Sequence, residues 1–93
     1  MTVLHKNLGS RGMFYVEYED EIAAEMIYSM PAEKTMMIEH TEVDEVLRGK
    51  NIGYELVQAA VEYARNHSLK VIPTCTFAQK VFKKKPEWKD VLE

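Results

Sequence analysis

The residues best suited to chemistry form one short segment in the middle of the chain, Arg48-Gly49-Lys50-Asn51-Ile52-Gly53. It comes just before the longest helical pattern, and the first turn of a helix leaves backbone N–H groups unpaired and carries a partial positive charge. Gly49 and Gly53 keep that backbone accessible to a bulky anion. Arg48 and Lys50 add positive charge at the same point. The segment predicts a phosphate site at a helix N-terminus, with an ordinary strand-to-helix turn as the alternative.

Two further side chains are candidates for a reaction. Cys75, the only cysteine, lies between a short apolar run and a second helical pattern, where helix-terminal amides would favour its thiolate form. The alternative for a free cysteine is a small buried side chain. His40 shares one face of an expected strand with Glu42 and is a candidate proton acceptor or partner of the thiol. The alternative for His40 is a hydrogen-bonded structural histidine, and Glu39 and Glu42 are weaker candidates for a base.

The first half of the chain has the patterns of β-strands. Aromatic and β-branched residues or alternating polarity predict strands over three ranges, 13–18, 22–29 and 35–43. Short turns between them, one of them over residues 31–34, predict an antiparallel meander. We expect four residues of the second strand on one face: Ile22, Ala24, Met26 and Tyr28. In the third strand we expect Met36, Ile38, His40 and Glu42 to share a face.

Beyond residue 50 the apolar residues recur at helical spacing. This predicts a helix over 51–67, a short strand over 69–73 and a second helix over 77–85. A strand joined to its neighbour through a helix runs parallel to it, so the last strand should pair parallel with residues 35–43. The apolar residues near the C-terminus are expected to fold back as a latch: Trp88, Val91 and Leu92.

Composition and charge narrow the class of protein. The 93 residues are 46% hydrophobic and suit one domain over 1–93, with residues 1–11 as a partly ordered arm or edge strand. Residues 17–45 hold ten acids and one lysine, whereas residues 65–89 hold seven bases and one acid. One half should therefore attract anions and the other repel them. We expect a cytoplasmic protein, since a single cysteine suits a reducing compartment. No apolar run is long enough to span a membrane, and cysteine and histidine are too few and too scattered to predict a zinc site.

The loop resembles a known family. Arg48 to Gly53 is similar to the [QR]-x-x-G-x-[GA] acetyl-CoA loop of the GNAT acyltransferase superfamily, with Asn51 at the position of the first glycine. His40-Thr41-Glu42-Val43 and Pro73-Thr74-Cys75 resemble the small, single-domain GNAT-like branch. The resemblance extends from about Phe14 to Leu92. It implies an α+β GNAT-like fold, a twisted and mostly antiparallel sheet with two main helices.

The resemblance also implies how acetyl-CoA is held. The two strands on either side of the long helix would splay apart, and the pantetheine arm would lie between them. Backbone groups of Thr41, Glu42 and Val43 would bind that arm, and the amides of the loop from Arg48 through Gly53 would bind the pyrophosphate. Lysines of the second helix would meet the 3′-phosphate: Lys80, Lys83 and Lys84. Cys75 would lie beside the thioester, where it could accept the acetyl group.

The function predicted on this basis is acetyl transfer from acetyl-CoA to an amine. The last helix has phenylalanine, at Phe77 and Phe82, where the family has a tyrosine acid, which favours the alternative of a CoA-binding module without transferase activity. A second alternative is an anion- or nucleic-acid-binding domain, although aromatic and basic residues do not interleave as base stacking requires. The short chain implies an open acceptor side, suited to a polyamine or a protein tail, in a monomer or weak dimer.

Overall fold

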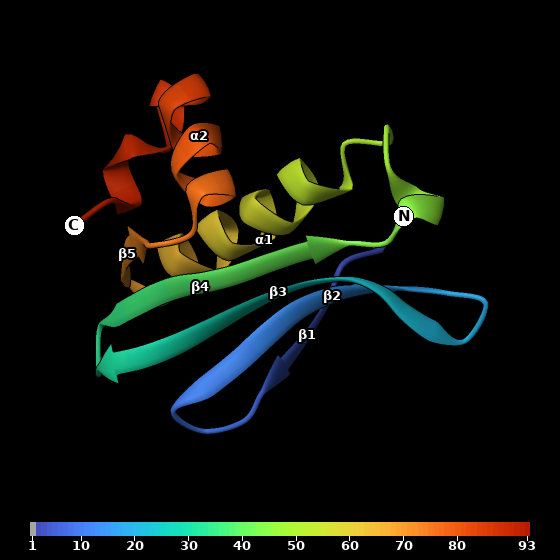
Figure 1. Ribbon diagram of the computed structural model, residues 1–93. Coiled ribbons are helices and arrows are strands. Elements are labelled where there is room, and N and C mark those ends of the chain that lie inside the picture. The colour runs from blue at the N-terminus through green and yellow to red at the C-terminus, as the bar shows by residue number, and fades with distance from the viewer. Residues whose placement is uncertain (1) are drawn as a thin grey trace.

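The computed structural model describes residues 2–93 and contains one five-stranded sheet in the order β1-β2-β3-β4-β5 (Figure 1). The strands are β1 (Leu4–Asn7), β2 (Arg11–Tyr18), β3 (Glu21–Ala32), β4 (Thr35–Val43) and β5 (Lys70–Pro73). Neighbours from β1 to β4 pair antiparallel, whereas β5 pairs parallel with β4. The predicted meander and the parallel last strand are confirmed. β1 adds an edge strand within residues 1–11.

Two helices and two short 3₁₀ helices complete the fold: η1 (Glu45–Leu47), α1 (Ile52–His67), α2 (Thr76–Lys84) and η2 (Pro86–Val91). α1 ends at Ser68, which adopts a left-handed conformation while its amide donates to the carbonyl of Ala64. Both α-helices lie on the same side of the sheet (Figure 1). The fold is therefore the α+β arrangement that the sequence predicts.

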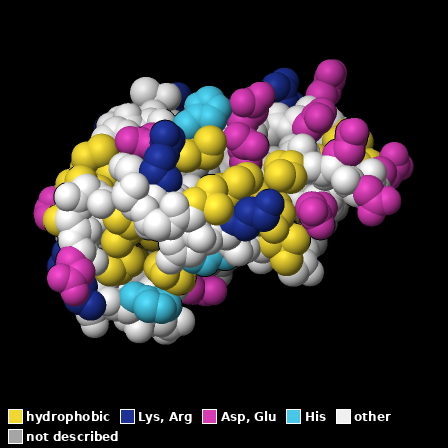
Figure 2. All heavy atoms as spheres, turned by 90° about the horizontal axis from the view of Figure 1, so that it is seen from below, with side chains coloured by type: hydrophobic (Ala, Val, Ile, Leu, Met, Phe, Trp, Pro, Cys, Tyr) yellow, Lys and Arg dark blue, Asp and Glu magenta, His cyan; other side chains and the backbone are white. Residues whose placement is uncertain are grey.

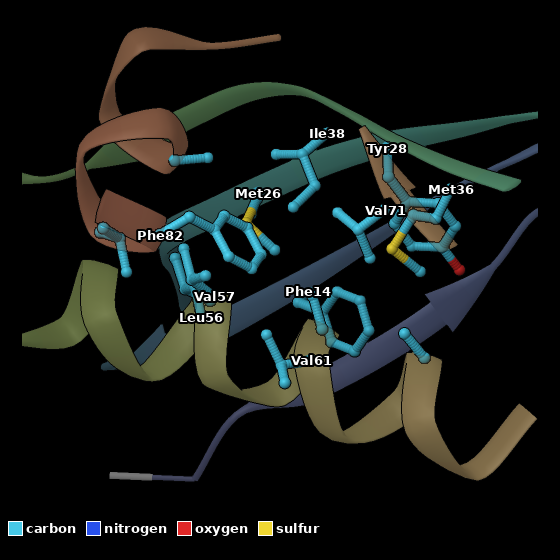
Figure 3. Close-up of a cluster of buried hydrophobic side chains, with 14 of the residues drawn as sticks. Phe14, Met26, Tyr28, Met36, Ile38, Leu56, Val57, Val61, Val71 and Phe82 are labelled. Carbon is cyan, nitrogen blue, oxygen red and sulfur yellow. The ribbon is translucent and has the colours of Figure 1, made fainter. Parts of the chain in front are cut away.

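The core lies between the sheet and these helices (Figure 3). The strands contribute Phe14, Met26 and Ile38, and α1 contributes Leu56 and Val61, each no more than 3% exposed. Burying a side chain of this size contributes about 1.5–3 kcal/mol. The amphipathic face of α1 therefore fixes the helix against the sheet, and with it the position of the loop that precedes the helix.

β3 differs from its prediction at both ends. It continues through Pro31 and Ala32, so the turn before β4 is shorter than the predicted turn over 31–34. Ile22 is 43% exposed, whereas Ala23 is buried. The pairing of β2 with β3 shifts register between Val16 and Glu17, and such a bulge interrupts the two-residue alternation that placed Ile22 on the same face as Ala24, so that part of the predicted face is wrong.

A second bulge lies in β4. Tyr28 pairs with Ile38 and Ile27 pairs with His40, so Glu39 is an extra residue in the strand. The predicted common face of Met36, Ile38, His40 and Glu42 is therefore wrong. Before the bulge, Met36 and Ile38 face the core; after it, Thr41 and Val43 take the helix-covered side, and His40 and Glu42 lie on the other.

The face of the sheet opposite the helices is open (Figures 1 and 2). Met13 of β2 pairs with Ile27 of β3 on this face, and Met37 of β4 pairs with Ser29 of β3; all three apolar side chains are partly buried. Figure 2 shows apolar side chains across the middle of the face and acidic side chains gathered at one end.

The C-terminal segment folds back on the sheet as predicted. Leu92 forms a bridge with Val71 of β5, and Val91 is buried. Arg65 of α1 donates to both carboxylate oxygens of Asp90, at 2.9 Å from Nε and 2.7 Å from Nη2. A bidentate guanidinium–carboxylate pair fixes geometry as well as charge, so η2 is held against α1.

A histidine–tyrosine pair joins β1 to the rest of the sheet. His5 Nε2 lies 2.6 Å from the hydroxyl of Tyr28, and the imidazole stacks on Phe14 with ring centroids 4.3 Å apart. Burial lowers the pKa of His5 below 6.5, and the nearby His67 adds to that effect. Burial, with a smaller effect of Tyr63, raises the pKa of Tyr28 to about 12.

The lowered pKa of His5 makes the free energy of unfolding depend on pH. Because the pKa of His5 is lower in the folded protein, the unfolded chain binds the proton more readily. The contribution of His5 is present above pH 6.5 and decreases as pH falls through the lowered pKa. We expect the free energy of unfolding, measured by urea titration, to fall from pH 7 to pH 5. His5→Phe should flatten this dependence, and an equally steep dependence in the variant would contradict it.

Candidate active site

The pairing of β4 with β5 stops halfway along β4. The last paired residues are Ile38 and Pro73, and Thr74 closes the pair by donating to the carbonyl of Ile38 from its amide at 2.9 Å and its hydroxyl at 2.7 Å. Beyond this point, residues 39–43 of β4 have no β5 partner within residues 2–93. β5 ends at Pro73, and the chain continues through Thr74 and Cys75 into α2, so the edge of β4 over residues 39–43 has no neighbouring strand.

Backbone direction decides which residues of β4 face this gap. The amide of Asp44 donates to Ala23 of β3 at 2.7 Å. By alternation Glu42 also directs its backbone toward β3, while Thr41 and Val43 direct theirs toward the gap. Arg48 Nε reaches the carbonyl of Val43 at 3.4 Å, in agreement with that direction. Of the three residues predicted to bind the pantetheine arm, Thr41 and Val43 are suitably placed, whereas the backbone of Glu42 is not.

The loop after β4 leads into the N-terminus of α1. Glu55 donates the first intrahelical bond, to the carbonyl of Asn51 at 3.1 Å. The amides of Ile52, Gly53 and Tyr54 therefore have no acceptor within the helix. Asn51 has φ 58° and provides no side-chain cap. These donors are available to an anion, as the sequence predicts for this turn.

Arg48 contributes to the loop differently from its prediction. Its amide donates to the carbonyl of Glu45 at 3.1 Å and closes η1. That amide is consequently not available to a pyrophosphate. The side chain of Arg48 remains exposed beside the loop. The candidate anion donors therefore begin after Arg48.

Glycine is favoured at the two loop positions for different physical reasons. Gly49 has φ 82°, a conformation that favours glycine, and a side chain there would meet no atom within 4 Å. Gly53 is buried, and a Cβ there would lie 2.5 Å from Cζ of Phe77 in α2. Gly53 is therefore required for the packing of α2 against α1. Gly53 also lines the hollow over the loop, so its role of leaving room for the ligand remains a prediction beside this packing role.

This packing gives a testable result. Gly53→Ala should lower the free energy of unfolding by about 1–3 kcal/mol, the usual cost of overpacking, because the methyl group must displace Phe77. In a Phe77→Leu background, where the ring is absent, the same substitution should cost less. Urea titration of the four proteins measures the coupling. An equal loss in both backgrounds would show that the two residues do not compete for space.

Cys75 lies at the end of the gap. It is the N-cap of α2, and its sulfur accepts a hydrogen bond from the amide of Ala78 at 3.4 Å. Its Sγ lies 3.5 Å from Oγ1 of Thr41, across the gap on β4. The thiol is only partly buried. The structure thus brings together Cys75, a helix N-terminus and the open edge of β4, and the hydroxyl of Thr41 is a contact that the sequence analysis missed.

His40 is not in this group. It follows the bulge and lies on the opposite face of β4 from Thr41, so it does not partner the thiol of Cys75. Its Nε2 lies 3.1 Å from Oε2 of Glu42, and both side chains are exposed. A neutral imidazole that donates from Nε2 to Glu42 keeps Nδ1 free to accept a proton. His40 and Glu42 therefore form a pair on the open face of the sheet.

Two hollows adjoin the open edge of β4. One has a volume of about 240 Å³, and Lys50 is not among its lining residues, which are Val43, Leu47, Arg48, Gly49, residues 51–54 and Phe77. The other, of about 380 Å³, is acidic, with Glu25, Glu42 and Glu45 among its lining residues. The acidic hollow would repel a diphosphate. The hollow over the loop is the better match for a phosphate-bearing ligand.

Among residues 2–93 no group of three histidine, cysteine, aspartate or glutamate side chains is arranged to hold a metal ion. None of the described helices is both long and apolar enough to cross a membrane.

Known proteins are similar to this chain in sequence and in fold. Residues 13–91 match the family described as GCN5-related N-acetyl-transferase. Protein NATD1 of Danio rerio is 36% identical over 63 residues, which are 68% of this chain and 57% of NATD1, and the human protein of that name is 32% identical over 63 residues. The chain thus matches just over half the length of these relatives.

Solved structures of acetyltransferases and a related protein also resemble this fold. A GCN5-like protein from Staphylococcus aureus superposes with a TM-score of 0.74 at 32% identity, covering 97% of this chain and 87% of that one. A GNAT family acetyltransferase from Elizabethkingia anophelis with acetyl-CoA bound has a TM-score of 0.64 at 20% identity, covering 83% of this chain and 53% of that one, and shows the fold alone. The chain belongs to the GCN5-related N-acetyltransferase family.

Proposed function

We propose that this protein binds acetyl-CoA and transfers its acetyl group to an amine. The observation that carries the proposal is the continuity of two features: the unpaired amides at the start of α1 and the open edge of β4 that ends at Cys75. The first suits a diphosphate, and the second suits an extended amide-containing arm. Membership of the acetyltransferase family supports the same ligand.

The ligand would lie along this path with its diphosphate at the start of α1 and its thioester toward Cys75. The diphosphate would accept from the amides of Gly49 and the first turn of α1. Each charge-assisted hydrogen bond of this kind contributes about 1.5–3 kcal/mol. The pantetheine amides would pair with the backbone of Thr41 and Val43, as an added strand does at a sheet edge. This places the thioester toward Cys75.

Two routes to the product are compatible with this arrangement. In the first, the sulfur of Cys75 attacks the thioester carbonyl, the bond to the CoA sulfur breaks, and CoA leaves as a thiol after taking up a proton. The acceptor nitrogen then attacks the S-acetyl group, loses a proton and regenerates the thiol of Cys75. In the second route the amine attacks the thioester directly. The contact of Thr41 with Cys75, with Oγ1 and Sγ 3.5 Å apart, favours the first, because it positions the sulfur at the end of the gap where the thioester is proposed to lie.

The acceptor would approach from the open face of the sheet. His40, oriented by Glu42, is the proposed acceptor of the amine proton. The acidic hollow beside it would attract a cationic amine, which suits a polyamine or a lysine-bearing protein tail.

Thermal unfolding with ligands tests the proposal. Acetyl-CoA and CoA should each raise the melting temperature in a concentration-dependent manner, whereas an equal concentration of ATP should raise it less, because binding to the folded state alone stabilises it. Acetyl-CoA hydrolysis or transfer to spermidine should then be detectable by release of free thiol. Stabilisation without any thiol release would favour a CoA-binding module. The absence of stabilisation by either ligand would refute the proposed function.

A further inference from the structure

A third hollow lies at the end of the sheet, beside the turn between β2 and β3. Its volume is about 470 Å³, and it is lined by that turn, the start of β3 and η1. Ile22, Ala23 and Asp44 line both this hollow and the acidic hollow described above. The two hollows therefore form one continuous depression, here called the end groove, lined by residues within 18–25 and 42–48.

Exposed apolar side chains gather at the outer part of the end groove. Within residues 2–93, four large apolar side chains are exposed, and three of them line the third hollow: Tyr18 at 38%, Ile22 at 43% and Val46 at 47%. The fourth, Leu8, lies in the turn between β1 and β2 and is 66% exposed. Single exposed apolar residues are common, whereas a group of them around one hollow is typical of a contact surface.

The surrounding backbone holds these side chains outward. The bulge in the β2–β3 pairing turns Ile22 away from the core, and Leu47 rather than Val46 is the buried residue of η1. The amide of Asp44 donates to the carbonyl of Ala23 at 2.7 Å and ties the start of η1 to β3. The carboxylate of Asp44 in turn accepts from the amide of Val46 at 3.4 Å. The apolar surface is therefore preformed.

The turn between β2 and β3 places acidic residues in an unfavourable backbone conformation. Tyr18 pairs with Glu21, so Glu19 and Asp20 form a two-residue turn, and both have positive φ, 52° and 66°. Asparagine and glycine are the residues that such turns favour. Turn geometry therefore does not account for two carboxylates at this position.

The end groove is strongly acidic along its whole length. Six carboxylates line it against one guanidinium, that of Arg48, and figures of the whole molecule place these acids at the end formed by the β2–β3 turn and η1 (Figures 1 and 2). Of the six, only Glu42 has an ion-pair partner within residues 2–93, which is His40. Carboxylates this close together repel one another, and a cationic partner relieves that repulsion. An anionic partner, such as a nucleic acid, would be repelled.

We propose that the end groove docks a basic protein segment that places one large apolar side chain against Ile22 and Val46. The carboxylates provide charge complementarity and a faster encounter, and the apolar contact provides specificity. From Glu21 to Glu25 the groove follows four residues of β3, about 13 Å, so about four extended residues of the partner fit along it. A free polyamine would leave the apolar side chains uncovered.

The docking surface also defines the class of acceptor. The groove ends at Glu42, which pairs with His40, so a docked segment would continue toward the proposed proton acceptor. A lysine-bearing basic protein is therefore favoured over a free polyamine. This use of the groove rests on the proposed function, whereas the docking itself does not.

Fluorescence anisotropy with synthetic peptides tests the apolar contact. The probe is a labelled peptide of lysines and glycines with one central leucine, and its partner peptide has serine in place of the leucine. The leucine peptide should bind about tenfold more tightly, because its apolar side chain leaves water. Val46→Ser should remove this preference. Leu8→Ser, which removes an exposed apolar side chain outside the groove, should preserve it.

A second pair of variants tests the charge. Glu21→Gln with Glu45→Gln should weaken the binding of both peptides about fivefold at low salt, and the difference should disappear at high salt. Glu33→Gln with Glu62→Gln removes the same charge from exposed positions outside the groove and should leave binding nearly unchanged. All four substitutions are at exposed positions, so the melting temperatures should agree.

Three results would contradict the proposal. The first is equal affinity for the leucine and serine peptides, and the second is an equal loss of binding in Val46→Ser and Leu8→Ser. The third is self-association in sedimentation analysis that Val46→Ser abolishes, because the groove would then be an interface between copies of this chain. CoA binding is measured in parallel. Peptide failure with CoA binding intact refutes only the docking surface, whereas peptide docking without CoA binding refutes the proposed function and leaves the docking surface in place.

Discussion

Gly49→Asp should weaken CoA binding about thirtyfold relative to Gly49→Asn. A side chain at this position has open space around it, and asparagine and aspartate tolerate the left-handed backbone of Gly49 better than other side chains do. The two variants differ in one charge. A carboxylate placed close to the bound diphosphate should cost about 2 kcal/mol at a solvated surface, and 1.4 kcal/mol corresponds to a tenfold change in affinity. Calorimetric titration of CoA into both variants measures the difference.

The design controls for backbone strain. Both substitutions impose the same left-handed conformation, so their melting temperatures without ligand should agree. The thirtyfold difference should also shrink at high salt, because a charge effect at an exposed loop is screened. Equal CoA affinities for the aspartate and asparagine variants would show that the diphosphate lies elsewhere.

Cys75→Ser should abolish the covalent acetyl adduct and lower the transfer rate about a hundredfold or more. Serine retains the N-cap of α2, which the sulfur now provides through Ala78, and is among the best N-cap residues. The variant should therefore remain folded while it loses a nucleophile, and the loss of a nucleophile removes much of the rate enhancement of a covalent mechanism. Intact mass after incubation with acetyl-CoA, together with thiol release, provides the measurement.

The matched control for the cysteine is Thr41→Val. It removes the hydroxyl that contacts Cys75 and keeps the shape of the side chain. The adduct should still form in this variant, but more slowly, and CoA affinity should be unchanged because the backbone of residue 41 remains. A transfer rate in Cys75→Ser equal to that of the unmodified protein would assign the reaction to direct attack by the amine.

Much of the fold was predictable because its signals are local. The apolar spacing from Ile52 to Ala64 determines the buried face of α1. The helix between β4 and β5 makes their pairing parallel. The glycines and cations of the loop mark the helix start that the structure has at Ile52. These features depend on periodicity and chain connectivity, which a single sequence contains.

The errors arise where the strand alternation is interrupted. The bulge at Glu39 reverses the faces of the residues that follow it, so His40 moves away from Cys75 and Thr41 takes its place. No residue type in β4 indicates this extra position. A glycine or a turn residue would have been a signal, but glutamate fits a regular strand equally well.

Three other features were not predicted, because they depend on tertiary contacts or on a local turn without a clear sequence signal. Gly53 is small because Phe77 of α2 packs on it, 24 positions later in the chain. The amide of Arg48 is used because residues 45–47 form a 3₁₀ helix, and no pattern in that short segment predicts one. That Lys84 and Asn51 line the same hollow depends on the angle between the two helices, which spacing within one helix does not determine.

The central claim is that acetyl-CoA binds along the start of α1 and the open edge of β4. The most direct measurement is an amide NMR titration of the isotope-labelled protein with CoA. The account predicts that the largest shifts fall on Gly49, Ile52 and Gly53 in the loop and on Thr41 and Val43 in β4. Saturable shifts confined to other surfaces, with these five amides unchanged, would contradict it.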